Sequence, residues 1–115
     1  MNRLTTMTLV AMLAVTSWAC GTPCSRIAGA EAVANDKGKA CGASSSNWEG
    51  ARVSRCEAGL TKCSADDQKW LDTYGDCLQK LPTCSEGQGV SWNLQRVACS
   101  ESLFKVSSSC GSAIQ

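Results

Sequence analysis

The feature that most constrains this chain is its nine cysteines in 115 residues. An odd number of cysteines in an exported protein requires either a modified residue or a thiol without an internal partner. If Cys20 is set aside, eight cysteines remain, and these can close as four disulfides in an oxidising compartment such as the periplasm or the cell exterior. The cysteines that we predict to form disulfides are Cys24, Cys41, Cys56, Cys63, Cys77, Cys84, Cys99 and Cys110.

The start of the chain has the features of a secretory leader. A short basic start at Arg3 precedes an apolar stretch over residues 4–15. This stretch has the length of a signal peptide and is shorter than the roughly 20 apolar residues that a membrane-spanning helix needs. Ser17 and Ala19 occupy the small-residue positions of a cleavage site. We therefore expect the leader to be removed directly before Cys20.

A cysteine directly after the cleavage site resembles the lipobox of bacterial lipoproteins. In that family the cysteine receives diacylglycerol on its sulfur and becomes the acylated N-terminus, although Ser17 stands where the family usually has leucine. The resemblance implies that Cys20 is lipidated. It also divides the chain into a signal peptide (1–19), a lipid-anchored N-terminus (20–24) and a disulfide-rich helical domain (25–115). The alternative is ordinary secretion, with Cys20 as a plain disulfide partner.

A weak internal repeat of about 21 residues organises the rest of the chain. In each unit a tryptophan, a cysteine and a leucine follow one another at helical spacing, which places the three side chains on one face of a helix. In the second unit Tyr74 and Leu78 extend this stripe. We expect the stripes to form the core. The three units are Trp48, Cys56 and Leu60; Trp70, Cys77 and Leu81; and Trp92, Cys99 and Leu103.

Helix start signals agree with the stripes. Ser46 followed by Glu49 has the form of a capping box, in which each side chain accepts a hydrogen bond from the other residue's backbone N–H. Ser64, followed by two acids that include Asp67, predicts the start of the next helix, because acids stabilise the positive end of a helix. Ser91 is positioned to cap the last helix.

The remaining segments complete an all-α prediction. The alanine-rich segment 25–39 predicts a first helix that ends near Gly38, whereas Pro82 and the polar segment 85–89 predict a loop. We expect a small disulfide-stapled bundle of about four helices with short loops and no strand. A period near 21 residues also occurs in solenoids. Three unequal units with one cysteine in each helix favour a compact antiparallel bundle instead.

Geometry restricts the disulfide pairing. Cys63 and Cys77, if joined by continuous helix, lie about 21 Å apart, which is far beyond the Cα separation of ~4.4–6.8 Å that a disulfide accepts. Facing residues in an antiparallel helical hairpin have a nearly constant sum of residue numbers. We therefore predict the pairs Cys77–Cys99 and Cys63–Cys110, which leaves the other four cysteines to attach the first two helices.

The composition argues against several function classes. There is no histidine, which removes Ser-His and Cys-His catalysis and the commonest imidazole metal ligand. Without Arg3 the chain carries ten basic and ten acidic residues, so it lacks the basic excess typical of nucleic-acid binding. We predict no catalytic residue, no metal ligand and no cofactor. Alternatives are a soft-metal protein for copper or zinc, thiol redox exchange, and a secreted toxin-like protein, although only Cys20 and Cys24 are closely spaced.

The segment from Tyr74 to Cys84, together with the lipobox-like cysteine, resembles the small cysteine-rich lipoproteins of Gram-negative bacteria, particularly of myxobacterial type. The resemblance implies a helical protein at the cell envelope and implies no particular activity. In such lipoproteins the residue after the acylated cysteine influences sorting, and Gly21 implies the outer membrane, facing periplasm or exterior. We expect a structural or partner-binding role. The partners are the membrane, through the N-terminal lipid, and a protein that the sequence does not identify.

Overall fold

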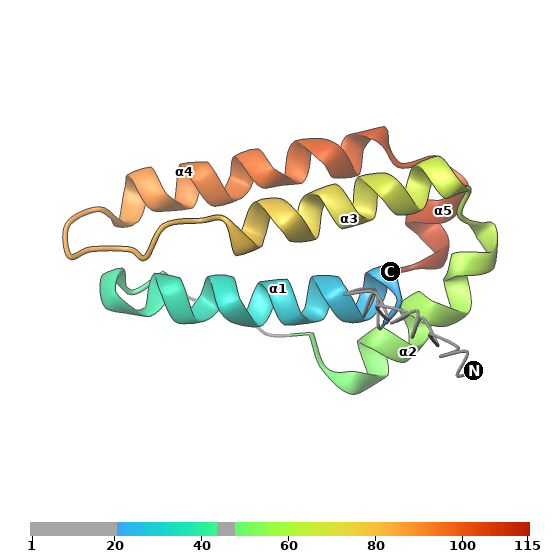
Figure 1. Cartoon of the computed structure of the whole chain (residues 1–115), viewed down its shortest axis with the longest axis horizontal. Helices are drawn as coiled ribbons and strands as arrows, with labels where there is room; N and C mark the ends of the chain where they lie inside the picture. The colour runs from blue at the N-terminus through green and yellow to red at the C-terminus, as the bar shows by residue number, and fades with distance from the viewer. Residues whose placement is uncertain (1–20, 44–47) are drawn as a thin grey trace, which may run out of the picture.

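The computed structural model describes residues 21–43 and 48–115, and these form a disulfide-stapled helical bundle without a strand (Figure 1). The all-α prediction is confirmed, whereas the predicted signal peptide and Cys20 lie outside the described residues. None of the described helices is both long and apolar enough to cross a membrane. The α-helices are α1 (Pro23–Gly38), α2 (Gly50–Gly59), α3 (Ala65–Gln79), α4 (Gly89–Cys99) and α5 (Ser108–Ala113), and the 3-10 helices are η1 (Lys39–Cys41), η2 (Leu60–Lys62) and η3 (Ser100–Lys105).

The long helices are not all antiparallel, which corrects the sequence-based expectation. α1 and α3 lie side by side and run in the same direction, and α4 returns along α3 in the opposite direction (Figure 1). Side-chain contacts follow the parallel order: Arg26 in the first half of α1 pairs with Asp72 in the middle of α3, and Glu31 accepts from Tyr74 further along both helices. α2 and η2 lie at the end of the bundle where α1 begins, so the chain enters α3 from that same end (Figure 1).

The core consists of two apolar clusters that both contact Tyr74. One lies between α1, the end of α3 and α4, and its largest side chain is Trp92, which is 2% exposed and donates from Nε1 to the Pro82 carbonyl oxygen at 2.7 Å. The other surrounds Ile27 and Leu71 near α5. A Cβ at Gly38 would lie 2.9 Å from the Trp92 ring, so this glycine lets the indole pack against α1.

The predicted stripes reach the core only in part. Leu78 and Leu81 of the second unit are buried, but Trp70 is half-buried and the Lys105 ammonium lies 4.3 Å from its ring centroid. The buried face of α3 instead includes Leu71, which the repeat did not contain. Trp48 stands before α2 and is half-buried. The predicted apolar face of α3 is therefore rotated by about one residue from the face that is buried. Helical spacing alone does not distinguish a face centred on Trp70 from one centred on the next residue, Leu71.

One predicted helix start is confirmed and another has shifted. Ser64 Oγ accepts from the Asp67 backbone N–H at 3.1 Å, and the Asp67 carboxylate accepts from the Ser64 N–H at 3.0 Å, which completes a capping box. α2 begins at Gly50 with Glu49 as its N-cap, so Glu49 is not the third helical residue, and Ser46 lies outside the described residues.

The prediction that Ser91 caps the last helix is wrong. α4 begins at Gly89 with Gln88 as its N-cap. The loop closes earlier than expected, because Gly87 adopts a positive φ of 79° and the Gln88 N–H donates to the Ser85 carbonyl oxygen at 3.0 Å. The chain is therefore already helical when it reaches Ser91.

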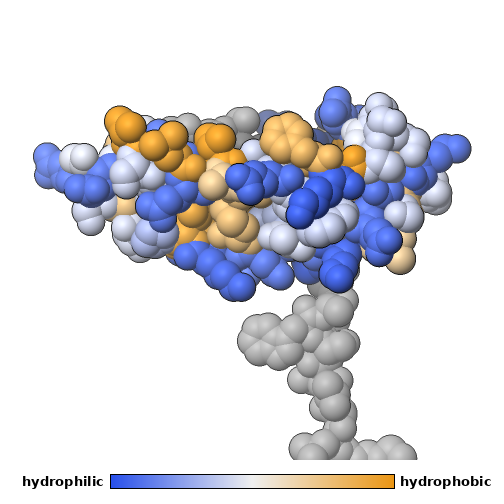
Figure 2. All heavy atoms as spheres, turned by 90° about the horizontal axis from the view of Figure 1, so that it is seen from above, coloured by the Kyte–Doolittle hydropathy of each residue, from blue (hydrophilic) through white to orange (hydrophobic). Residues whose placement is uncertain are grey.

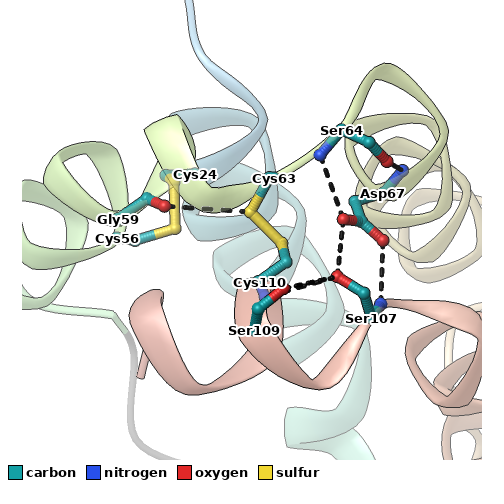
Figure 3. Close-up of a disulfide and its surroundings, with 9 residues drawn as sticks. All are labelled: Cys24, Cys56, Gly59, Cys63, Ser64, Asp67, Ser107, Ser109 and Cys110. Atoms are coloured by element: carbon teal, nitrogen blue, oxygen red, sulfur yellow. Dashed lines mark hydrogen bonds between the residues drawn. A yellow bond between two sulfur atoms is a disulfide. The ribbon is translucent and has the colours of Figure 1, made fainter.

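Asp67 connects the start of α3 to the segment that enters α5 (Figure 3). In addition to Ser64, its carboxylate accepts from the Ser107 backbone N–H at 2.8 Å and from the Ser107 hydroxyl at 2.7 Å. These hydrogen bonds, first of all that from the Ser107 backbone, lower the pKa of Asp67 to about 2. The Cys63–Cys110 disulfide joins the same two segments. A charged hydrogen-bond cluster and a covalent bond thus secure α5 together.

The low pKa of Asp67 predicts a loss of stability in acid. A carboxyl group whose pKa is lower in the folded than in the unfolded chain stabilises the fold above the unfolded value, here 3.8, and this contribution disappears as the pH falls towards 2. The difference in thermal midpoint between wild type and Asp67→Asn should therefore be large at pH 7 and shrink between about pH 4 and pH 2. Asp66→Asn, at an exposed neighbour, is the control. A difference that stays constant with pH would contradict this role for Asp67.

Candidate functional site

Eight of the nine cysteines are joined to one another. Both bridges predicted for the C-terminal part, Cys63–Cys110 and Cys77–Cys99, are present in the structure. Figure 3 shows that Cys24–Cys56 lies close to Cys63–Cys110 at the end of the bundle formed by α2 and α5. Four disulfides indicate an oxidising, extracytoplasmic location. The complete set is Cys24–Cys56, Cys41–Cys84, Cys63–Cys110 and Cys77–Cys99.

The pairing determines what the cysteines can do chemically. A cysteine in a disulfide has no thiolate to offer to a soft metal ion. None of the eight remains as an internal partner for Cys20, which lies outside the described residues. Within residues 21–43 and 48–115, the side chains of metal-binding type do not form a group of three or more.

An apolar cavity of about 220 Å³ lies at the end of the bundle where α2, α3, η3 and α5 meet. Ile27 and Leu71, each 1% exposed, contribute buried surface to its lining. The cavity borders the second core cluster, and Val106, where the backbone becomes extended after η3, is part of its lining. The half-buried hydrophobic side chains that line it are Trp48, Leu103, Val106 and Ile114.

Arg52 is the charged side chain in the cavity lining. Its guanidinium carbon lies 4.2 Å from the centroid of the Trp48 ring, a distance suited to a cation–π interaction. No carboxylate in the described part of the chain lies within ion-pair distance of Arg52. The cavity therefore combines apolar and aromatic walls with one cation that lacks an acidic partner.

Tyr74, which lines the cavity, belongs to a polar network with Glu31 and Arg96. The Tyr74 hydroxyl donates to Glu31 Oε1 at 2.6 Å, and Arg96 Nη2 donates to Glu31 Oε2 at 2.6 Å. Burial is the main cause that raises the pKa of Tyr74, and the hydrogen bond to Glu31 raises it further. The hydroxyl thus stays a proton donor at neutral pH. The network joins α1, α3 and α4 and fixes the orientation of the Tyr74 ring.

The outer face of α4 is apolar and exposed. Val90, Leu94 and Val97 are 80%, 66% and 66% exposed, and Phe104 in η3 is 86% exposed. The spacing of the three α4 residues places them on one side of the helix. Figure 2, which views the molecule from the α4 side, shows hydrophobic side chains gathered along one edge. We call Val90, Leu94, Val97 and Phe104 the α4 apolar row.

Three of the four residues of the α4 apolar row lie on α4, a helix with almost no charge. Between residues 89 and 100 the only charged residue is Arg96, and its guanidinium forms an ion pair with Glu31. The exposed polar neighbours of the three α4 residues, Ser91, Asn93 and Gln95, are uncharged, whereas the exposed Lys105 follows Phe104. The exposed residues on this side of α4 are therefore all uncharged.

Neither the cavity nor the α4 apolar row was among the sequence-based predictions. The predicted site residues were the cysteines, and the structure distributes their bridges along the bundle rather than gathering them into one site. The row had a signal in the sequence, since Val90, Leu94 and Val97 follow a helical spacing of their own. The cavity had none, because its lining comes from five separate parts of the chain.

Comparisons with protein-family models, with curated proteins and with solved structures found no match for this chain.

Proposed function

We propose that this chain is an exported, non-catalytic domain that a lipid on Cys20 holds at the cell envelope, where the α4 apolar row binds a protein partner. The exposure of the row carries the proposal. Single exposed hydrophobic side chains are normal on protein surfaces, whereas a contiguous set marks an interaction site. Depletion of charge at the centre of a surface is also the composition typical of protein interfaces.

The size of the row limits the kind of complex. Burying a Val, Leu or Phe side chain contributes roughly 1.5–3 kcal/mol, so the four side chains offer roughly 6–12 kcal/mol at most. Association costs roughly 4–15 kcal/mol in lost freedom of movement. The row is therefore the centre of a larger contact with its polar neighbours rather than the whole interface. A helix that lies on a membrane surface usually carries several Lys or Arg residues beside its apolar face. α4 carries only Arg96, which is paired with Glu31, and this favours a protein partner instead.

The cysteine pairing supports the lipid anchor. Because the other eight cysteines are used in four bridges, the odd cysteine of the chain is the one that follows the predicted cleavage site. Gly21 and Thr22 are the only residues between Cys20 and α1. A lipid on Cys20 would hold the first turn of α1 close to the membrane surface.

Site-specific photo-crosslinking in cells tests the proposal. A photoreactive residue in place of Leu94 should give a discrete adduct, and Val97→Glu in the same protein should remove it by placing a charge in the contact. The same probe in place of Lys62, which is exposed on η2, is the matched control and should give no such adduct.

Cell fractionation of the same strains tests the anchor. A single acyl chain binds membranes marginally and two hold stably, so wild type should sediment with membranes and Cys20→Ser should be soluble.

Equal adducts from the Leu94 and Lys62 probes would contradict partner binding by the α4 apolar row. A Cys20→Ser protein that remains with the membranes would contradict the lipid anchor.

A further inference from the structure

We propose that the cavity lined by Trp48, Tyr74 and Leu103 binds a small carboxylic acid with an aromatic or short alkyl body, and that Arg52 binds the carboxylate. This site is separate from the α4 apolar row, and the proposal does not depend on the lipid anchor or on the protein partner. Three properties of the cavity support it: its volume, its charge and its rigidity.

The volume sets the size of the ligand. An apolar cavity of about 150 Å³ in another protein holds one benzene molecule, and the present cavity measures about 220 Å³. It therefore has room for one aromatic ring with a short side arm, or for an alkyl chain of similar volume. It is smaller than the roughly 300–1,000 Å³ typical of sites for drug-sized ligands. A lipid with two acyl chains does not fit.

The charge selects an acid over a neutral molecule. Arg52 presents a planar fork of N–H donors, which matches the two oxygens of a carboxylate. Stacking on Trp48 holds the guanidinium beside the cavity. Glu31, which accepts from the hydroxyl of the cavity-lining Tyr74, is paired with Arg96 at 2.6 Å, and this pairing offsets its charge. Among the described residues, Arg52 is the cavity-lining cation without an acidic partner.

The frame around the cavity is rigid, which lowers the cost of binding. Cys110 of α5 is completely buried and bonded to Cys63, and Cys56 of α2 is bonded to Cys24 of α1. The backbones of α2 and α5 also lie in close contact at Gly59, where an added Cβ would lie only 2.1 Å from a carbonyl oxygen of α5. A site that is already formed loses little conformational freedom when a ligand enters.

Isothermal titration of the folded, disulfide-bonded chain tests the site. The probes are 3-phenylpropionate and octanoate, and each is compared with its neutral amide. Both acids should bind saturably at one site, and the amides should bind about tenfold or more weakly, because hydrogen bonds to charged groups are the stronger ones. Arg52→Gln should reduce the affinity for the acids to that for the amides. Arg55→Gln, at an exposed position on the same helix, is the matched control and should leave both affinities unchanged.

A second variant tests the contribution of the cavity volume to binding independently of the Arg52 charge. Val106→Phe places extra volume in the cavity and should weaken the binding of acids and amides alike, with the helical circular dichroism retained. If that variant does not fold, Leu103→Phe serves the same purpose. Absence of saturable binding by both acids, equal affinity for acids and amides, or an Arg52→Gln protein that binds acids as wild type does would overturn the proposal.

Discussion

Reduction of the four disulfides is expected to unfold the domain at room temperature. Disulfides contribute roughly 2–4 kcal/mol each, and small domains have total stabilities of roughly 5–15 kcal/mol. Removal of all four therefore takes away about as much free energy as the whole fold has. The apolar clusters are small, since Ile27, Leu71 and Leu78 are the only completely buried aliphatic side chains larger than alanine in the described residues.

Far-ultraviolet circular dichroism before and after reduction measures this effect. Thiols should be blocked by alkylation after reduction so that the bridges cannot form again. We expect most of the helical signal to disappear. A reduced, alkylated protein that keeps its helicity and its thermal midpoint would show that the apolar clusters hold the bundle together without the cysteines.

Glu31→Ala is expected to be the most destabilising single substitution outside the disulfides. The side chains of Arg96 and Glu31 are only 16% and 9% exposed. Removing one partner of a buried ion pair costs roughly 3–5 kcal/mol, because the other charge stays largely buried without the carboxylate that offset it. Tyr74 loses the acceptor of its hydroxyl in the same variant. For a domain of this size the thermal midpoint should fall by more than about 10 °C.

An exposed ion pair at the end of the same helix, between Asp36 of α1 and Lys39 of η1, is the matched control. Asp36 and Lys39 lie 2.7 Å apart with side chains that are both 72% exposed. Exposed pairs contribute about 0–1 kcal/mol, so Asp36→Ala should change the thermal midpoint by only a few degrees. Similar midpoints for Glu31→Ala and Asp36→Ala would contradict a structural role for the buried network.

Features encoded by neighbouring residues could be predicted from the sequence. The prediction that Ser64 caps the start of α3 depends on four consecutive residues and is confirmed. The pairs Cys77–Cys99 and Cys63–Cys110 followed from the antiparallel order of α3 and the chain after it. Local hydrogen bonding and chain direction were sufficient for these features.

Features that depend on how elements meet could not be predicted. The parallel packing of α1 on α3 depends on the path of α2, for which the sequence holds no local signal. α4 carries hydrophobic residues on two faces, and only packing decides that Trp92 is buried while Leu94 is exposed. The stacking of Arg52 on Trp48 beside the cavity likewise becomes visible only when α2, α3 and α5 are brought together.

Intact-mass spectrometry of the protein extracted from its native membrane tests the central claim, that the nine cysteines provide four structural disulfides and one lipid anchor. The predicted mass lacks residues 1–19 and includes the added mass of the lipid. On reduction it should rise by two hydrogens for each of the four disulfides. A protein that carries an unmodified Cys20 thiol, or whose mass does not change on reduction, would contradict the claim.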